Sequence, residues 1–171
     1  TEITNSAGRI GFVTRLTSDA EITYSTFLGG DTISDVVADA SGNSYVVGAG
    51  GREDFPTTPG AFAPEEILAE DNETRLRGDF TSKISSSGEL EYSSWFQLSR
   101  DVLQIGYDSI ALDGDRVIIS GADTGGTDRS SFFIRFESDF SRLLDYTVVD
   151  DQVGNTSWIT SSGIIDGALY L

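Results

Sequence analysis

Phe80-Thr-Ser-Lys-Ile84, Ser85-Ser-Ser-Gly88 and Leu90-Glu-Tyr-Ser-Ser-Trp-Phe96 follow one another closely in this chain. The two outer segments are rich in aromatic and branched residues, which favour β-strands. The middle segment is polar and ends in a glycine, as tight turns between strands commonly do. The three segments together predict a β-hairpin over residues 80–96.

The same hairpin sequence pattern occurs twice more. One copy is Phe12-Val-Thr-Arg-Leu16 with Ile22-Thr-Tyr-Ser-Thr-Phe-Leu28, and the other is Phe132-Phe-Ile-Arg-Phe136 with Leu143-Leu-Asp-Tyr-Thr-Val-Val149. Each copy carries one cation at the same position of its first strand, flanked by apolar neighbours. Because the cation recurs with the strand, we interpret Arg15, Lys83 and Arg135 as structural, paired with an acid of the sheet or lying on its surface.

A second type of hairpin follows each of these copies. It covers Val36 to Gly48 in the first copy and Ser109 to Gly121 in the second. In the third copy it comprises Trp158-Ile and then Ile164 to Leu171, with Trp158 aligned to Val36 and Ile110. Each is an apolar strand, a turn of Asp, Gly or Asn residues and another apolar strand, and such turns suit tight hairpins.

Four short strands therefore recur, with a period of 68 residues from Arg15 to Lys83 and 52 from Lys83 to Arg135. Repeats of about 40 to 50 residues with four strands each are typical of β-propeller blades. A β-sandwich could also use short strands with regular turns, but it would not explain why the same four-strand sequence pattern recurs. The predicted fold class is an all-β propeller with four-stranded antiparallel blades.

Three motifs of the first copy resemble a known family. Tyr24-Ser-Thr-Phe-Leu-Gly-Gly30, Asp39-Ala-Ser-Gly-Asn-Ser-Tyr-Val-Val-Gly48 and Asp54-Phe-Pro-Thr-Thr-Pro-Gly-Ala-Phe62 are similar to SBBP repeats, which are named for a seven-bladed β-propeller. The second copy lacks the proline-rich motif, and the third has diverged further. The resemblance implies the propeller fold and a bacterial secreted or cell-surface protein. It implies no catalytic residues, because structural positions define these repeats.

The resemblance also implies that the innermost strand of each blade comes first. The chain is then part of a single propeller domain: an outer half-blade at 1–30, whole blades at 31–98 and 99–150, and an inner half-blade at 151–171. Unpaired strand edges are avoided by natural proteins, and repeats depend on their neighbours for stability. We therefore expect the strands near Ile10 and Leu171 to pair with further polypeptide or neighbouring subunits, or to be the least ordered.

The blade arrangement places the aromatic residues. Trp95 aligns with Phe27 and, like Trp158, is expected to be buried on a strand. Pro56 and Pro59 stiffen the proline-rich motif, so that its flanking phenylalanines can hold it against the blade. Among surface aromatic residues that could stack on a sugar, Phe55 and Tyr107 are the candidates.

Composition excludes several kinds of function. The net charge of −17 repels nucleic acids and anionic membranes. The chain has neither His nor Cys, the usual general base and the usual ligands of transition metals. No apolar run approaches the roughly 20 residues that span a membrane. Any bound ion is therefore expected to be a hard cation held by oxygen atoms.

Calcium is the cofactor for which the sequence offers ligands. Carboxylates occur in the loops that enter each blade, where they could gather near a propeller axis: Asp31, Asp35, Asp101, Asp108, Asp150 and Asp151. Their spacing matches no EF-hand, and solvated loop residues are the alternative interpretation. Two loop carboxylates could also serve as a glycosidase pair.

The function that these observations favour is a non-enzymatic extracellular module with a structural, adhesion or protein-interaction role in a larger propeller protein. No catalytic or cofactor-binding residue is predicted. The alternatives are a hydrolase or lyase acting on carbohydrate and a carbohydrate- or calcium-binding module, so surface polysaccharide is a second possible partner. A glycan array screened with and without calcium would separate these hypotheses.

Overall fold

The computed structural model describes residues 10–30, 32–50, 55–62, 78–96, 105–123, 130–149, 163–165 and 168–170. All regular structure in these residues is β-strand, as predicted. The strands are β1 (Gly11–Leu16), β2 (Ile22–Gly29), β3 (Thr32–Ala38), β4 (Ser44–Gly50), β5 (Gly78–Ile84), β6 (Leu90–Phe96), β7 (Ile105–Asp113), β8 (Arg116–Asp123), β9 (Ser130–Glu137), β10 (Leu143–Val149), β11 (Gly163–Ile165) and β12 (Ala168–Tyr170).

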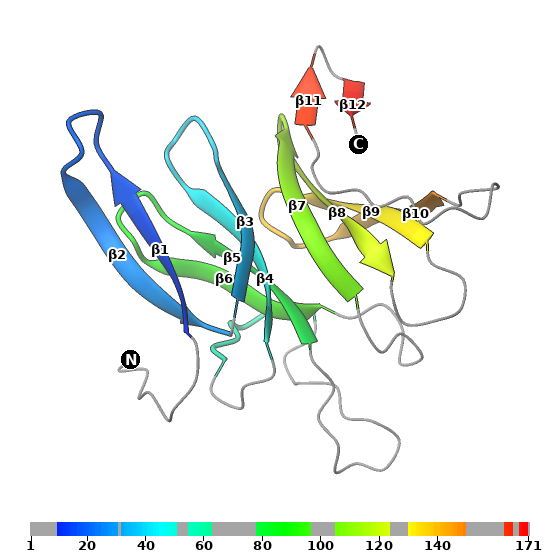
Figure 1. Cartoon of the computed structure of the whole chain (residues 1–171), viewed down its shortest axis with the longest axis horizontal. Coiled ribbons are helices and arrows are strands. Elements are labelled where there is room, and N and C mark those ends of the chain that lie inside the picture. Colours follow the sequence, from blue (N-terminus) through cyan, green and yellow to red (C-terminus); the bar gives the residue numbers. More distant parts are fainter. Residues whose placement is uncertain are drawn as a thin grey trace, which may run out of the picture.

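The strands form two four-stranded antiparallel sheets and two separate hairpins. One sheet has the order β3-β4-β5-β6 and the other β7-β8-β9-β10, so each strand pairs with the next along the chain. The hairpins are β1–β2 and β11–β12. Figure 1 shows β1–β2, β3–β6 and β7–β10 side by side across the molecule, with β11–β12 beyond β7. The predicted four-stranded units are therefore confirmed as sheets.

The first strand of each sheet begins close to the acids that the sequence places in the entering loops. β3 begins at Thr32, where Ile33 pairs with Gly48, so Asp35 lies on the strand and not in a loop. β7 begins at Ile105, so Asp108 also lies on a strand. In the third copy, Gly163–Ile165 pairs with Ala168–Tyr170. Trp158, which the sequence aligns with Val36, lies outside the described residues.

Two apolar cores lie on opposite faces of the sheet β3–β6. Toward β1–β2, Val46, Phe80 and Trp95 pack with Val13 and Leu28. The other core lies toward β7–β10 and uses the side chains that point to the opposite face. There Tyr45, Val47 and Tyr92 pack with Ile110, Val117, Ile119, Phe132, Ile134, Phe136 and Phe140. Successive side chains of a strand point to opposite faces, so one strand serves both cores.

In β4 and β8 three consecutive apolar residues are buried, Tyr45 to Val47 and Val117 to Ile119, because both faces of these strands are covered. The predicted burial of Trp95 is confirmed. Over the described residues the structure has no helix long and apolar enough to cross a membrane.

The turn between β3 and β4 is organised by one carboxylate. Asp39 accepts hydrogen bonds from the backbone N–H groups of Ser41 and Asn43, both at 2.9 Å, and from the side-chain amide of Asn43 at 2.8 Å. Asn43 in turn accepts a bond from the backbone of Ser86, in the turn between β5 and β6. This bond shows that the two turns lie at the same end of the sheet.

The Asp39 turn predicts a pH-dependent contribution to stability. Burial alone would raise the pKa of Asp39, but the bonds from Asn43, Ser41 and Tyr45 outweigh it and lower the pKa below its ordinary value of 3.8. A carboxyl with a lowered folded pKa stabilises the protein above the unfolded pKa, and the effect is lost as pH falls through the folded value. We expect Asp39→Ala to cost about 1 kcal/mol at neutral pH, the net contribution of the hydrogen bonds that hold this partly exposed turn.

Urea unfolding at several pH values would test this expectation. The difference between Asp39→Ala and the wild type should shrink as the pH falls below the ordinary carboxyl value of 3.8, because the wild-type carboxyl, whose pKa is lowered, then becomes protonated. Asp19→Ala, in the exposed turn between β1 and β2, is the matched control and should change stability little at any pH. A pH-independent cost for Asp39→Ala would contradict the role assigned to the carboxylate.

Candidate interaction site

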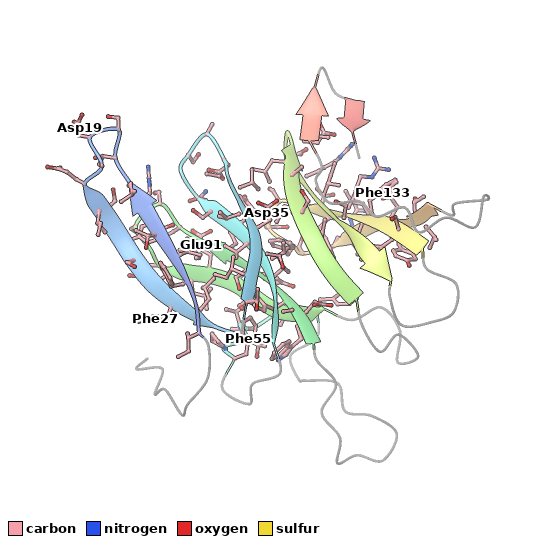
Figure 2. The ribbon with its side chains drawn as sticks, viewed as in Figure 1. Asp19, Phe27, Asp35, Phe55, Glu91 and Phe133 are labelled. Carbon is pink, nitrogen blue, oxygen red and sulfur yellow. The ribbon has the colours of Figure 1, made fainter. Side chains whose placement is uncertain are left out.

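Asp35 joins the two four-stranded sheets. It lies on β3, and its Oδ2 atom accepts hydrogen bonds from the backbone N–H of Ile110 at 2.9 Å and from the Ser109 hydroxyl at 3.2 Å, both on β7. Its Oδ1 atom accepts a bond from the N–H of Val36 at 2.8 Å. Figure 2 shows Asp35 between β3 and β7. This carboxylate, one of the calcium candidates, thus connects β3 to β7 through hydrogen bonds.

The other calcium candidates cannot be placed around it. Asp108 lies on β7, where the pairing with β8 is irregular between Tyr107 and Ser109, and the side chains of Tyr107 and Asp108 are not described. Four candidates fall outside the described residues: Asp31, Asp101, Asp150 and Asp151. In the described part of the chain no three Asp, Glu, His or Cys residues form a group suited to a metal ion. The calcium site remains a prediction from the sequence.

Removal of the Asp35 carboxylate should loosen the contact between the sheets. Ile110 is buried, so Asp35→Ala removes the acceptor of its backbone N–H at a place that water does not reach. We expect a loss of about 1 to 3 kcal/mol, the usual cost of an unsatisfied buried group. Thermal unfolding measures it, with Asp19→Ala as the control. Equal stability of the two variants would show that the bonds to β7 contribute nothing.

The recurring cation is structural in all three copies, as predicted. Lys83 lies 3.1 Å from Glu91 and also stands over the ring of Tyr45. Arg135 binds both carboxylate oxygens of Asp145, with its Nε atom 2.8 Å from Oδ1. The pairing keeps both groups charged, because the hydrogen bonds between them raise the pKa of Arg135 and lower that of Asp145.

Arg15 differs from its two counterparts because it crosses to the next sheet. Its Nη1 atom donates to the backbone carbonyl of Ser86 at 2.8 Å and to that of Gly42 at 3.4 Å. These carbonyls belong to the two turns at one end of β3–β6. The hydroxyl groups of Tyr24 and Ser44 lie 3.0 Å apart and form a second polar link between the same pair of sheets.

The proline-rich motif packs on the sheet, but not as a surface site. The ring centroid of Phe55 lies 4.5 Å from those of both Phe80 and Trp95, and Phe55 is buried. The prediction that Phe55 could be a surface stacking residue was therefore wrong, whereas its predicted packing is confirmed. Phe62 is half-exposed and meets the edge of Phe136 in the next sheet.

A groove of about 650 Å³ runs between β1 and the sheet β3–β6. One wall consists of five consecutive residues of β1, from Phe12 to Leu16. The opposite wall is the face of β3 with Ile33 and Val36, and the turn Asp39–Gly42 closes one end. Consecutive strand residues point to opposite faces, so a wall of five in a row means that the groove meets β1 along its edge.

A second apolar surface covers the face of β1–β2 that points away from β3–β6. Phe12, Leu16, Ile22 and Phe27 are all exposed there, and Figure 2 shows Phe27 at the outer margin of the molecule. Their counterparts Phe80, Ile84 and Trp95 are buried. Contiguous exposed apolar side chains of this kind mark interaction surfaces.

No family model and no curated protein matches this chain. The candidate site is therefore defined by geometry alone: a groove, an apolar face and an edge of β1 that pairs with no described strand, all at the β1–β2 end. The sequence analysis expected an incomplete edge near Ile10, but it did not find the groove. The sequence holds no signal for it, because Val36 and Ile110 are similar residues whose surroundings differ only in the folded chain.

Proposed function

We propose that this chain is a non-enzymatic structural module of a larger β-propeller protein on a bacterial surface, and that it works by holding neighbouring polypeptide. In this proposal β3–β6 and β7–β10 are blades, and the two hairpins belong to incomplete blades. The sequence resemblance to SBBP repeats supports the propeller and the extracellular location. The apolar surfaces of β1–β2 support a role in protein interaction or adhesion.

One observation carries the proposal. In both four-stranded sheets the strands follow one another in chain order, and the first strands, β3 and β7, lie next to each other and are joined through Asp35. The first strand of the following hairpin, β11, lies beside β7 in turn. Propeller blades are four-stranded sheets arranged radially around a channel, so their first strands are neighbours.

The polar side chains near the sheet contacts support a structural role over a catalytic one. Asp35, Arg15 and Asp39 each make hydrogen bonds that hold one turn or sheet to another. A catalytic carboxylate needs a neighbour that perturbs it and an accessible position for a substrate. The carboxylates named here instead bind backbone N–H groups of the fold.

A crystal structure of the chain tests the propeller. The operation that superimposes β3–β6 on β7–β10 should be a rotation about an axis beside β3 and β7, and the same operation should carry β1–β2 onto β5–β6. A rotation axis beside β6 and β10, or two different operations, would contradict the proposal, because blades share one axis.

Polysaccharide assays test the absence of catalysis. We expect no release of reducing ends or unsaturated products from a panel of bacterial polysaccharides, with or without calcium. Turnover that disappears on replacing two loop aspartates by asparagine would overturn the non-enzymatic role and favour the carbohydrate-active enzyme. Binding without turnover on a glycan array would identify the adhesion partner as carbohydrate.

A further inference from the structure

We propose that the groove beside β1 is the docking site of a β-hairpin from a further repeat unit, whose second strand pairs antiparallel with β1. This inference rests on the proposed function, since it names the partner that the module holds and the place where it is held. The chain itself supplies the template, because two complete sheets show what occupies the equivalent place.

The first step is the edge of β1. β1 is the counterpart of β5 and β9 in the internal repeat, with Phe12 in the place of Phe80 and Phe132. β5 pairs on one side with β6 and on the other with β4, and β9 likewise lies between β10 and β8. Among the described residues β1 pairs with β2 alone. Its other edge, which faces the groove, offers the backbone groups that β4 and β8 satisfy in the complete sheets.

The second step is the floor of the groove. Val36 is 50% exposed, whereas Ile110, its counterpart in the next sheet, is 4% exposed. Ile110 is covered by the sheet β3–β6, where it packs with Tyr45 and Val47 of β4 and binds Asp35 of β3. A hairpin like β3–β4, added to β1, would cover Val36 in the same way. Edge pairing and apolar cover therefore require the same occupant.

The third step is the sequence that the occupant must have. In β4, Gly48 lies opposite Phe80, and in β8, Gly121 lies opposite Phe132. A Cβ atom at Gly48 would come within 2.6 Å of the Phe80 ring, so a side chain does not fit opposite this phenylalanine. Apolar residues precede the glycine, as Tyr45-Val-Val in β4 and Ile118-Ile in β8. The strand that pairs with β1 therefore carries a glycine opposite Phe12, preceded by apolar residues.

The fourth step is the position of the chain's own spare hairpin. β11–β12 lies beside β7, on the side of the molecule opposite β1–β2 (Figure 1). Within one copy it therefore does not fill the groove. The occupant comes from a separate repeat unit, and main-chain pairing with pockets for alternate side chains is the established way in which a strand is added to a sheet edge.

The experiment adds a synthetic peptide of residues 32–50, the chain's own β3–β4 hairpin, to the full chain. Hydrogen exchange of the β1 amides over 11–16 should slow about tenfold or more at saturating peptide. A peptide with Gly48→Val is the matched control and should leave the exchange unchanged. Protection by both peptides alike, or protection elsewhere but not in β1, would overturn the proposal.

Variants of the chain test whether the peptide binds in the groove. Val36→Asp puts a charge on the groove floor and should weaken binding of the peptide at least about tenfold, since a buried unpaired charge is costly. Val148→Asp, at a similarly exposed valine of β10, should bind the peptide normally. Equal binding by the two variants would contradict the site.

A form of the chain with the hairpin covalently attached tests the same pairing when the free peptide is too flexible to bind. In it, a second copy of residues 32–77 precedes Ile10, so that the connection between β4 and β5 is reproduced ahead of β1. Protection of the β1 amides and a higher Tm than that of the form with Gly48→Val in the added copy would support the proposal; no difference between the two forms would overturn it.

Sedimentation of the chain without peptide tests whether a second copy of the chain occupies the groove instead. Dimers that protect β1 and exclude the peptide would make a second copy the occupant and overturn the proposal as stated. The proposed function is judged separately by the rotation between the sheets. A common axis without peptide binding refutes only this inference, and binding without a common axis refutes only the propeller.

Discussion

Trp95→Ala is expected to lower the free energy of unfolding by roughly 3 to 5 kcal/mol, the usual cost of emptying a large aromatic site in a core. The indole is 4% exposed, and its nearest aromatic neighbour is Phe55, at 4.5 Å between ring centroids. Gly78 lies under it so closely that a Cβ atom there would come within 2.8 Å of the ring. The cavity therefore cannot be refilled by a small movement of one neighbour.

The internal repeat provides the matched control. Phe27 occupies the same repeat position on β2 and is 61% exposed, so Phe27→Ala should change stability by about 0.5 kcal/mol or less in the isolated chain. Urea unfolding of both variants measures the difference. Similar costs at the two positions would show that the face of β1–β2 is covered in solution. A negligible cost at Trp95 would contradict the packing of the proline-rich motif.

The strands could be predicted because their signals are local and repeated. Each hairpin has its own turn residues, and three copies of one text fix which segments correspond, so the pairing of Lys83 with Tyr92 and of Val46 with Ser82 follows the predicted order. Loop ends were predicted less well. Asp35 was assigned to an entering loop, although it lies on β3, where Ile33 pairs with Gly48 and packs against the core.

Phe55 shows where local reasoning fails. Pro56 and Pro59 predict a stiff connector that its phenylalanines hold against the blade, but the sequence also left Phe55 as a surface candidate for stacking on a sugar. The extended path that the prolines impose instead returns the ring to the space between Phe80 and Trp95. Burial of this kind depends on which residues meet across the fold, and a pattern in one segment does not contain that information.

The candidate site could be predicted only in part for the same reason. Asp35 was selected as an acid in a loop, whereas its bonds to Ile110 depend on the approach of two sheets. The groove lies where β5 pairs with β4 in the complete sheet, whereas among the described strands β1 has only β2 as a partner. Comparison of equivalent positions after folding reveals it, since Val36 and Ile110 are similar residues with different surroundings.

Gly48→Ala is the substitution that should most disturb the pairing of β3 with β4. A Cβ atom at this position would lie 2.2 Å from the backbone oxygen of Thr32 and 2.6 Å from the Phe80 ring. The ring could shift, but the Thr32 oxygen belongs to the neighbouring strand, so relief requires the two strands to move apart. Overpacking in a core costs typically about 1 to 3 kcal/mol, and we expect a value at the upper end because backbone is involved.

Hydrogen exchange together with urea unfolding would measure this effect. The amides of β3 and β4 should exchange faster in Gly48→Ala, because the ladder between Thr32 and Ala49 is opened, while those of β9 and β10 should not change. Gly163→Ala is the control, since a Cβ atom there has no neighbour within 4 Å. If Gly48→Ala proved as stable as this control, a side chain would fit opposite Phe80, and the glycine that we require opposite Phe12 in a docked hairpin would lose its physical basis.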